Sequence, residues 1–378
     1  MKIAVLKETI AGEKRVAIIP DSLKRLKKKN FEVIVQSGAG EAAGFADKDY
    51  EDQGAVVESS IEKLAAAEAF IKVLPPTLEE VEQIPEGKTL ISILQPMTRH
   101  ELVAKLVARK ITAFGMDVIP RTTLAQSMDI LSSMSTIAGY KAVLLAADSI
   151  NKFFPMLMTA AGTVAPARVM VLGAGVAGLM ACATAKRLGA VVEATDVRPE
   201  VKEQVKSVGA KFLEVKSEES GAGEGGYAKE MSEDYKQRQA EMIAKHIAKA
   251  DVVIPTALIP GRKAPILITE AHVKSMKPGS VIVDLAAEMG GNCELTEKDQ
   301  NIVKHGVLII GNSNLPSTMS YHASQMFSKN IERFLFHLAD ENGFKMDMND
   351  EITRGSLVTR DGEIIHALTK KLIAEGGN

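Results

Sequence analysis

The feature that most constrains the fold of this sequence is a glycine-rich turn at residues 168–196. Residues 169–172 are typical of a buried parallel strand, and Gly173, Gly175 and Gly178 have the spacing G-x-G-x-x-G that opens a helix. The first glycine permits a tight turn, the second lets the backbone approach a phosphate, and the third allows close packing of helix on strand. A helix that begins there offers N–H groups and the positive end of its dipole to an anion.

The residues after this turn continue the pattern of a dinucleotide-binding unit. A helix ends at Gly189, residues 190–195 resemble a second strand, and Asp196 follows about 20 residues after the turn. A carboxylate at that strand end can accept hydrogen bonds from both ribose hydroxyls of adenosine and would repel a 2′-phosphate. The pattern predicts NAD(H) in preference to NADP(H). Two alternatives stay open: Arg198 could accommodate a 2′-phosphate, and a glycine turn can be purely structural.

A second glycine-rich stretch, residues 37–44, competes for the role of phosphate loop. No good helix pattern follows it, and residues 45–50 resemble a loop. We therefore expect the nucleotide at the first turn and not at this one.

Length and patterning predict two α/β domains. The 378 residues suffice for two cores, and apolar runs alternate with amphipathic helices from the N-terminus onward. Strands are expected at 3–6, 16–19 and 31–36. We expect two Rossmann-like domains with parallel sheets and a cleft between them. Residues 1–130 plus 318–378 would form an N-terminal α/β domain with a C-terminal return, and residues 131–317 the NAD(H)-binding domain.

Four connecting stretches carry further expectations. Residues 126–150 have the spacing of a long helix, and residues 153–168 are expected to cover the second sheet. The glycine-rich stretch 216–231 is either a solvated loop or a lid that closes over the nucleotide. Residues 357–365 contain an Asp-Gly turn between apolar runs, which predicts a hairpin and a candidate dimer contact.

Composition limits the classes of function. The formal net charge of −2 offers no basic field for nucleic acid. The N-terminus reaches charged residues too soon for a signal peptide, which favours the cytoplasm. Cys182 and Cys293 give no disulfide framework, and the seven histidines show no metal-ligand spacing, so we expect no metal. The uncharged run 169–185 contains the glycine turn and is not expected to span a membrane.

Ordered motifs along nearly the whole chain carry a family resemblance. The sequence closely resembles the NAD(H)-binding component of proton-translocating nicotinamide nucleotide transhydrogenase. The matching motifs are Lys7-Glu8, Arg15-Val16-Ala17, Pro120-Arg121, residues 125–133, 138–140 and 158–163, the glycine turn, Thr195 to Arg198, and residues 225–231, 256–261 and 276–284. One departure is Leu124, where the family's pattern leads us to expect an arginine.

The resemblance implies which residues act. In that family an arginine, a glutamine and an aspartate position the nicotinamide, and they correspond here to Arg121, Gln126 and Asp129, with Ser132 beside them. The cofactor-binding residues expected on this basis are Gly173, Gly175, Val176, Gly178, Asp196, Val197, Arg198, Gly226, Tyr227, Ala257 and Leu258.

The resemblance also implies partners. NADP(H) would be bound by a second component, and protons would pass through a membrane-spanning component. The present chain would be a homodimer in the cytoplasm, peripheral on the inner face of the membrane through its partner subunits.

The predicted loop also makes chemical sense without the resemblance. Hydride transfer between two nicotinamides requires no nucleophile and no general acid; it requires rings held in position in a dry site. Arginine, glutamine and aspartate can fix a carboxamide and each other by hydrogen bonds. The alternative is a helix-start cap network around Asp129.

Two other functions stay open at this point. Alanine dehydrogenase has a related fold, and Lys72 and Arg15 could match its substrate lysine and carboxylate partner. Its catalytic histidine, however, corresponds to Gln95 and its catalytic aspartate to Glu288, which removes the natural carrier of acid–base chemistry at neutral pH. A non-catalytic NAD-sensing module is the third possibility, because a binding motif does not prove turnover.

Overall fold

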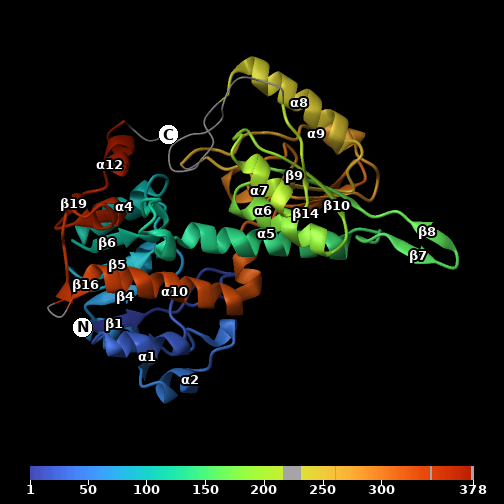
Figure 1. Cartoon of the computed structure of the whole chain (residues 1–378). Helices are drawn as coiled ribbons and strands as arrows, with labels where there is room; N and C mark the ends of the chain where they lie inside the picture. The colour runs from blue at the N-terminus through green and yellow to red at the C-terminus, as the bar shows by residue number, and fades with distance from the viewer. Residues whose placement is uncertain (216–230, 260, 341–342, 376–378) are drawn as a thin grey trace. The chain divides into compact units, whose positions relative to one another are not determined.

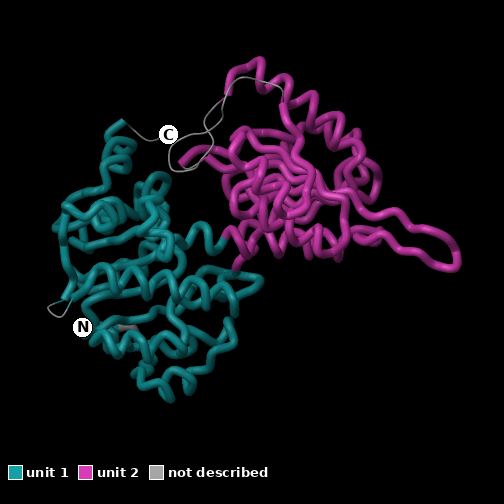
Figure 2. The backbone as a smooth tube through the Cα atoms, viewed as in Figure 1, with its two compact units in different colours: residues 1–134, 317–378 teal, residues 135–316 magenta. Residues whose placement is uncertain are grey.

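The structure, a computed structural model, describes residues 1–215, 231–259, 261–340 and 343–375 and contains two compact units. Unit 1 comprises Met1–Met134 and Ser317–Asn378, and unit 2 comprises Ser135–Pro316 (Figure 2). The division between Met134 and Ser135 falls within one helix, α5 (Ile130–Ser149). The two Rossmann-like α/β sheets predicted from the sequence are confirmed, one in each unit.

Unit 1 is built on an eight-stranded sheet with the order β3-β2-β1-β4-β5-β6-β18-β19 (Figure 1). Its strands are β1 (Lys2–Val5), β2 (Glu32–Gln36), β3 (Val56–Glu58), β4 (Ala69–Ile71), β5 (Thr89–Ser92), β6 (Thr112–Gly115), β18 (Leu357–Arg360) and β19 (Glu363–Ile364). The first six pair in parallel in the order 3-2-1-4-5-6, which is that of a dinucleotide-binding fold.

Helices cover both faces of this sheet. They are α1 (Pro20–Lys28), α2 (Asp47–Asp52), α3 (Leu78–Gln83), α4 (His100–Ala108), α10 (Ser320–Leu338), α11 (Glu351–Ser356) and α12 (Ala367–Ala374). Alternate side chains of each strand face opposite ways. Leu90 of β5 joins one core with Leu102 and Val103 of α4, while Phe114 of β6 contacts Phe334 of α10 with ring centroids 5.7 Å apart. The C-terminal segment therefore returns to unit 1 through α10.

The hairpin expected at residues 357–365 is present and continues this sheet. β18 pairs antiparallel with β6 and β19 with β18, joined by the two residues Asp361 and Gly362. Both have positive φ, 51° and 81°, as the favoured two-residue hairpin turn requires.

The strand expected at residues 16–19 is wrong. These residues are buried but lie outside the sheet, and serine hydroxyls of α10 take the place of a neighbouring strand. Ser324 Oγ accepts from Val16 N at 2.9 Å and Ser328 Oγ from Ile19 N at 3.1 Å. Buried backbone donors need a partner, and here side chains supply it.

Unit 2 is built on a seven-stranded sheet with the order β11-β10-β9-β12-β13-β15-β14. Its strands are β9 (Arg168–Leu172), β10 (Val191–Thr195), β11 (Lys211–Phe212), β12 (Val252–Pro255), β13 (Val281–Val283), β14 (Asn301–Lys304) and β15 (Val307–Ile310). All pair in parallel except β14, an antiparallel edge strand that the sequence did not predict. The parallel strands again have the order 3-2-1-4-5-6.

The sheet of unit 2 lies between two helical layers. Its helices are α5, α6 (Val176–Arg187), α7 (Val201–Ser207), α8 (Glu233–Ile247) and α9 (Glu270–Ser275). Val143 of α5 and Ala181 of α6 share one core cluster, and Ile243 of α8 and Val273 of α9 share the other. Within the described residues, α5 alone is long and apolar enough to cross a membrane, with a mean hydropathy of 1.4, but a core helix passes the same test.

Residues 153–168 do not cover the sheet as expected. They contain an antiparallel hairpin, β7 (Leu157–Thr159) and β8 (Gly162–Val164), that projects from the body of unit 2 (Figure 1). Met158 at its end is 82% exposed and Phe153 at its base is 59% exposed. A second small hairpin, β16 (Ala339–Asp340) and β17 (Gly343–Phe344), follows α10 in unit 1.

Candidate functional site

The glycine turn of unit 2 lies between β9 and α6, where the sequence predicted it. Gly173 has a φ of 99°, and a Cβ there would lie 2.6 Å from Thr256 Oγ1. A Cβ on Gly178 would lie 1.9 Å from the Gly173 carbonyl oxygen, so the helix can start this close to the strand only with glycine. A Cβ on Gly175 meets only Arg198 Nη2, at 3.7 Å. The turn is sterically committed at its two ends and open at its centre.

This turn carries the start of a 12-residue helix. Gly175 is the N-cap of α6, and no side chain among the described residues caps it. Val176, the first residue of the helix, is 39% exposed. A helix start without a side-chain acceptor is suited to an anionic ligand, because its N–H groups and dipole favour negative charge.

Asp196 follows β10 and faces the same turn. Its side chain is 5% exposed, and Oδ2 accepts a hydrogen bond from Ala174 N at 2.7 Å. Oδ1 accepts from the backbone N and the Nε of Arg198, both at 2.9 Å, and Arg198 Nη2 lies 2.8 Å from Oδ2. The hydrogen bond to Asp196 raises the pKa of Arg198 above its usual value. Asp196, Val197 and Arg198 are therefore held beside the glycine turn.

The segment that follows β12 lies next to the turn, because β12 and β9 are neighbours in the sheet. Thr256 N donates to Leu172 O at 2.8 Å, and Thr256 Oγ1 donates to Gly173 O at 3.0 Å. Ala257 follows, and Leu258 is 44% exposed. β9 and β12 mark the point where the strand order reverses, and ligands of open α/β sheets bind in the crevice at that point.

A buried amide that the sequence analysis missed holds Ala257. Asn292, which is fully buried, accepts from Ala257 N at 2.9 Å and donates to Ala257 O at 2.9 Å and Pro265 O at 2.8 Å. The available signal was two glycines directly before an asparagine, just after a strand. Gly226 and Tyr227, also predicted to bind the cofactor, lie outside the described residues.

The predicted nicotinamide loop belongs to unit 1. Asp129 directly precedes α5 and accepts from Ser132 N at 2.9 Å and from Ser132 Oγ at 2.6 Å. This is a helix cap, so the structural interpretation of Asp129 is realised. Arg121 Nη2 lies 3.8 Å from Asp129 Oδ2, which brings these three side chains together. Gln126 begins the short helix η4 (Gln126–Met128) and is exposed.

A buried side chain of α10 supports η4 from below. Asn330 is 6% exposed and donates through Nδ2 to Ser127 O at 2.8 Å. Ala125 and Met128 are buried on either side of Gln126 and Ser127. The loop thus has a fixed backbone and exposed side chains. Asn330 lies about two hundred residues further along the chain, and no local pattern marks it.

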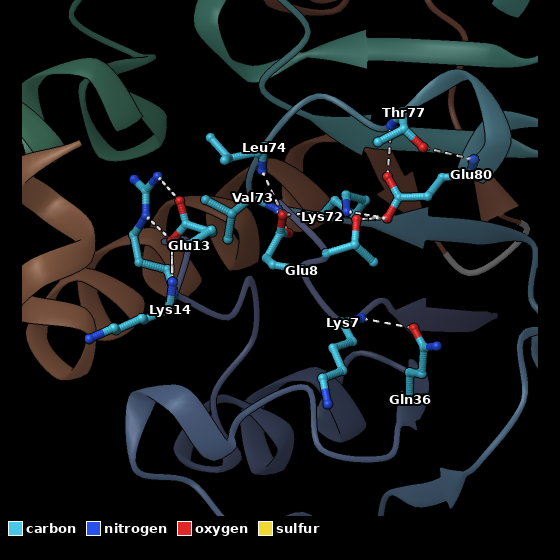
Figure 3. A network of polar contacts seen from close by, with 12 residues as sticks. Lys7, Glu8, Glu13, Lys14, Gln36, Lys72, Val73, Leu74, Thr77 and Glu80 are labelled. Atoms are coloured by element: carbon cyan, nitrogen blue, oxygen red, sulfur yellow. Dashed lines mark hydrogen bonds and ion pairs between the residues drawn. The ribbon is translucent and has the colours of Figure 1, made fainter. Parts of the chain in front are cut away.

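In unit 1 the corresponding reversal of strand order, between β1 and β4, is filled by charged side chains (Figure 3). Lys72 is fully buried, 2.8 Å from Glu80 Oε1 and 3.4 Å from Glu8 Oε2. Glu8 Oε1 also accepts from Val73 N at 2.7 Å, and burial raises the pKa of this carboxyl. Arg15, 4% exposed, makes a two-point contact with Glu13, at 2.6 and 2.8 Å.

These pairs bear on the alanine dehydrogenase alternative. The two cations that would bind a substrate carboxylate are already matched by carboxylates of the chain itself. At the position of the catalytic histidine, Gln95 donates its backbone N to Asp117 and accepts from Arg99 Nε at 2.7 Å. Amide and guanidinium groups do not exchange protons near neutral pH.

The competing glycine stretch 37–44 also contains its own anion. Asp47 accepts from Gly38 N at 2.8 Å and from Ser37 Oγ at 2.6 Å, so a carboxylate of the chain takes the donors that a phosphate would use. No group of three or more His, Cys, Asp or Glu side chains among the described residues could hold a metal ion. Burial raises the pKa of Cys182 to about 12 and that of Cys293 to about 11, which makes both thiols unreactive.

Comparison with known proteins gives consistent matches over the whole chain. Residues 4–138 match the family model "Alanine dehydrogenase/PNT, N-terminal domain" and residues 142–367 match "Alanine dehydrogenase/PNT, C-terminal domain". The first of the separate parts of NAD(P) transhydrogenase subunit alpha in Rhodospirillum rubrum is 50% identical over 380 residues, covering 98% of this chain and 99% of the relative. The crystal structure of transhydrogenase from Sinorhizobium meliloti has a TM-score of 0.86 at 40% identity, covering 97% of this chain and 99% of that one. Alanine dehydrogenase of Halomonas elongata is 33% identical and covers 99% of this chain and 96% of the relative.

Proposed function

The chain belongs to the alanine dehydrogenase/PNT family, and we propose that it acts as the NAD(H)-binding component of a proton-translocating NAD(P) transhydrogenase. The observation that carries this proposal is the glycine turn with Asp196 at the reversal point of the unit 2 sheet. The relatives named NAD(P) transhydrogenase subunit alpha are 42–50% identical over nearly the full chain, and the alanine dehydrogenase relatives are more distant, at 33% and 27%.

The residues at the turn fit the adenosine and pyrophosphate end of a dinucleotide. Gly175 leaves the centre of the turn open, and the start of α6 provides donors for a pyrophosphate. Asp196 is the acceptor for ribose hydroxyls. Ala257 and Leu258 line the neighbouring strand end. Gly226 and Tyr227 complete the proposed set.

We propose NAD(H) and not NADP(H) as the cofactor of this chain. Arg198 is the cation beside the turn that could favour a 2′-phosphate, and its guanidinium is bound to Asp196 through two nitrogens. The pair leaves little net positive charge where the phosphate would lie. A ribose hydroxyl, in contrast, can exchange with Arg198 for the carboxylate oxygens.

The bound NADH supplies a hydride, two electrons and one proton, to C4 of the NADP⁺ nicotinamide held on the partner component, leaving NAD⁺ and NADPH. Arg121, Gln126 and Asp129, with Ser132, hold the nicotinamide carboxamide in position. None of these groups donates or removes a proton in the transfer. Their contribution is orientation and the exclusion of water.

The partners follow from this half-reaction. We propose that a second component binds NADP(H), that a membrane-spanning component passes protons, and that this chain is a cytoplasmic homodimer, peripheral on the inner face of the membrane through its partners. The relatives are named as one portion of a subunit alpha, which supports an assembly of several polypeptides. The exposed hairpin β7–β8, with Met158 at its end, supports a protein contact in unit 2.

Mixing the full chain with the NADP(H)-binding component of a related transhydrogenase tests the proposal. We expect reduction of an NAD analogue by NADPH at a rate well above that of either protein alone. Gln126→Asn should slow this transfer by more than about tenfold while the NADH dissociation constant changes less than about twofold. No transfer by the mixture, or oxidation of NADH that depends on pyruvate and ammonia, would overturn the assignment.

A further inference from the structure

A fully buried asparagine joins two loops at the reversal point of the unit 2 sheet. Asn292 lies in the segment after β13, and all three of its hydrogen bonds reach a different segment, the one after β12. Both amide protons of its Nδ2 are used, one on Ala257 O and one on Pro265 O. The orientation of the amide is therefore determined by its partners.

These bonds imitate the pairing of a strand. β12 ends at Pro255, and Asn292 presents both an acceptor and a donor to the single residue Ala257. Thr256, one residue earlier, is bonded to Leu172 and Gly173 of the glycine turn. Two successive residues are thus tied to opposite sides, and the direction of the backbone at 257–258 is fixed.

Asn292 is itself held by a rigid loop. Asp284, fully buried after β13, accepts from Ala286 N at 2.9 Å, Cys293 N at 2.9 Å and Thr296 Oγ1 at 2.7 Å. Gly291 before it has a φ of 83°, and a Cβ there would lie 2.9 Å from Asp284 Oδ2. The loop therefore leaves no freedom for the amide to turn away.

We infer that Asn292 is a positioning residue for NAD(H) binding: it sets the backbone of Ala257 and Leu258 against the glycine turn without touching the nucleotide. This inference rests on the proposed function, because it assumes that the nucleotide lies at this edge of the sheet. A purely structural role would affect unfolding alone.

Asn292→Asp tests the inference, since it keeps the shape of the side chain and removes both donated hydrogen bonds. We expect the NADH dissociation constant of the full chain to rise about tenfold at pH 8 and to recover partly toward pH 5.5, where a protonated carboxyl can again donate. The matched control is Asp251→Asn. Asp251 is 3% exposed, accepts from Arg168 N at 2.9 Å at the opposite edge of the same sheet, and lies 2.9 Å from Lys152 Nζ.

The control should lower the melting temperature and leave the NADH dissociation constant unchanged. If Asn292→Asp lowers the melting temperature and binds NADH like the wild type, the positioning role is wrong while the proposed function stands. If the wild type binds NADH but transfers no hydride to an NADP(H) component, the proposed function fails and the binding data still decide the role of Asn292. Asn292→Ser, which retains one donor, should fall between the two in NADH affinity.

Discussion

The two sheets have the same strand order, yet their reversal points are built in opposite ways. In unit 2 the segments after β9 and β12 carry Gly173 and Thr256, and the turn between them is open at Gly175. In unit 1 the segments after β1 and β4 carry Glu8 and Lys72, whose side chains meet inside the protein. The same topology thus provides an open edge in one unit and a closed one in the other.

The difference lies in which groups satisfy the backbone. At the closed point Val73 N donates to the carboxylate of Glu8, which takes the place that an anionic ligand could take. At the open point the start of α6 has no capping side chain among the described residues. Strand order alone therefore does not locate a nucleotide site; the residues directly after the strands do.

The largest effect is expected from opening the closed point. Lys72→Met leaves Glu8 and Glu80 buried without their cation and should lower the free energy of unfolding of unit 1 by about 3–5 kcal/mol. Chemical denaturation measures this. Lys105→Met, which removes a partly exposed pair with Glu82, is the matched control and should cost only a small fraction of that loss. Equal losses would show that the closed point is not held by its charges.

A smaller effect is expected at the open point. Asp196→Asn removes the charged acceptor and should weaken NADH binding about tenfold, or about 1.4 kcal/mol, with little change in NADPH binding. Equilibrium binding followed by NADH fluorescence measures both. Asp117→Asn makes the same change in unit 1, where the carboxylate accepts from Leu94 N and Gln95 N, and should leave NADH affinity unchanged. Loss of affinity in both variants would contradict the assignment of the nucleotide to unit 2 alone.

The sequence predicted the open point because its signals are local. Three glycines, a helix and Asp196 follow one another within a single βαβ unit, and each glycine has a steric reason visible in the turn. The cap at Asp129 was likewise predicted as an alternative, because its partner Ser132 is three residues away.

Features that depend on distant partners could not be predicted. Residues 16–19 have the composition of a strand, but their donors are satisfied by serines about three hundred residues away. Asn292 lies 35 residues from Ala257, and Asn330 lies 203 residues from Ser127. The closed point was invisible for the same reason, since Lys72 follows a different strand from Glu8.

The smallest expected effect is a pH dependence that separates the buried carboxylate of the closed point from ordinary surface acids. Burial raises the pKa of Glu8, so the folded state holds this proton more tightly than the unfolded state. Its contribution to stability is full below the unfolded pKa and is lost as the pH rises through the folded pKa. Glu8→Gln cannot ionise and keeps an oxygen for Val73 N. The variant should therefore gain stability relative to the wild type between pH 5 and pH 8.

Glu82→Gln is the control with the opposite sign. The hydrogen bond from Lys105 lowers the pKa of Glu82, so this carboxylate stabilises the fold once ionised, and its loss should count against the variant as the pH rises. Free energies of unfolding at pH 5 and pH 8 for the three proteins decide the matter. If Glu8→Gln instead loses stability relative to the wild type as the pH rises, the ionised Glu8 is favoured by Lys72 more than it is penalised by burial. The closed point would then be held by net electrostatic attraction, and the contrast with the open point would rest on charge and not on the satisfaction of backbone donors.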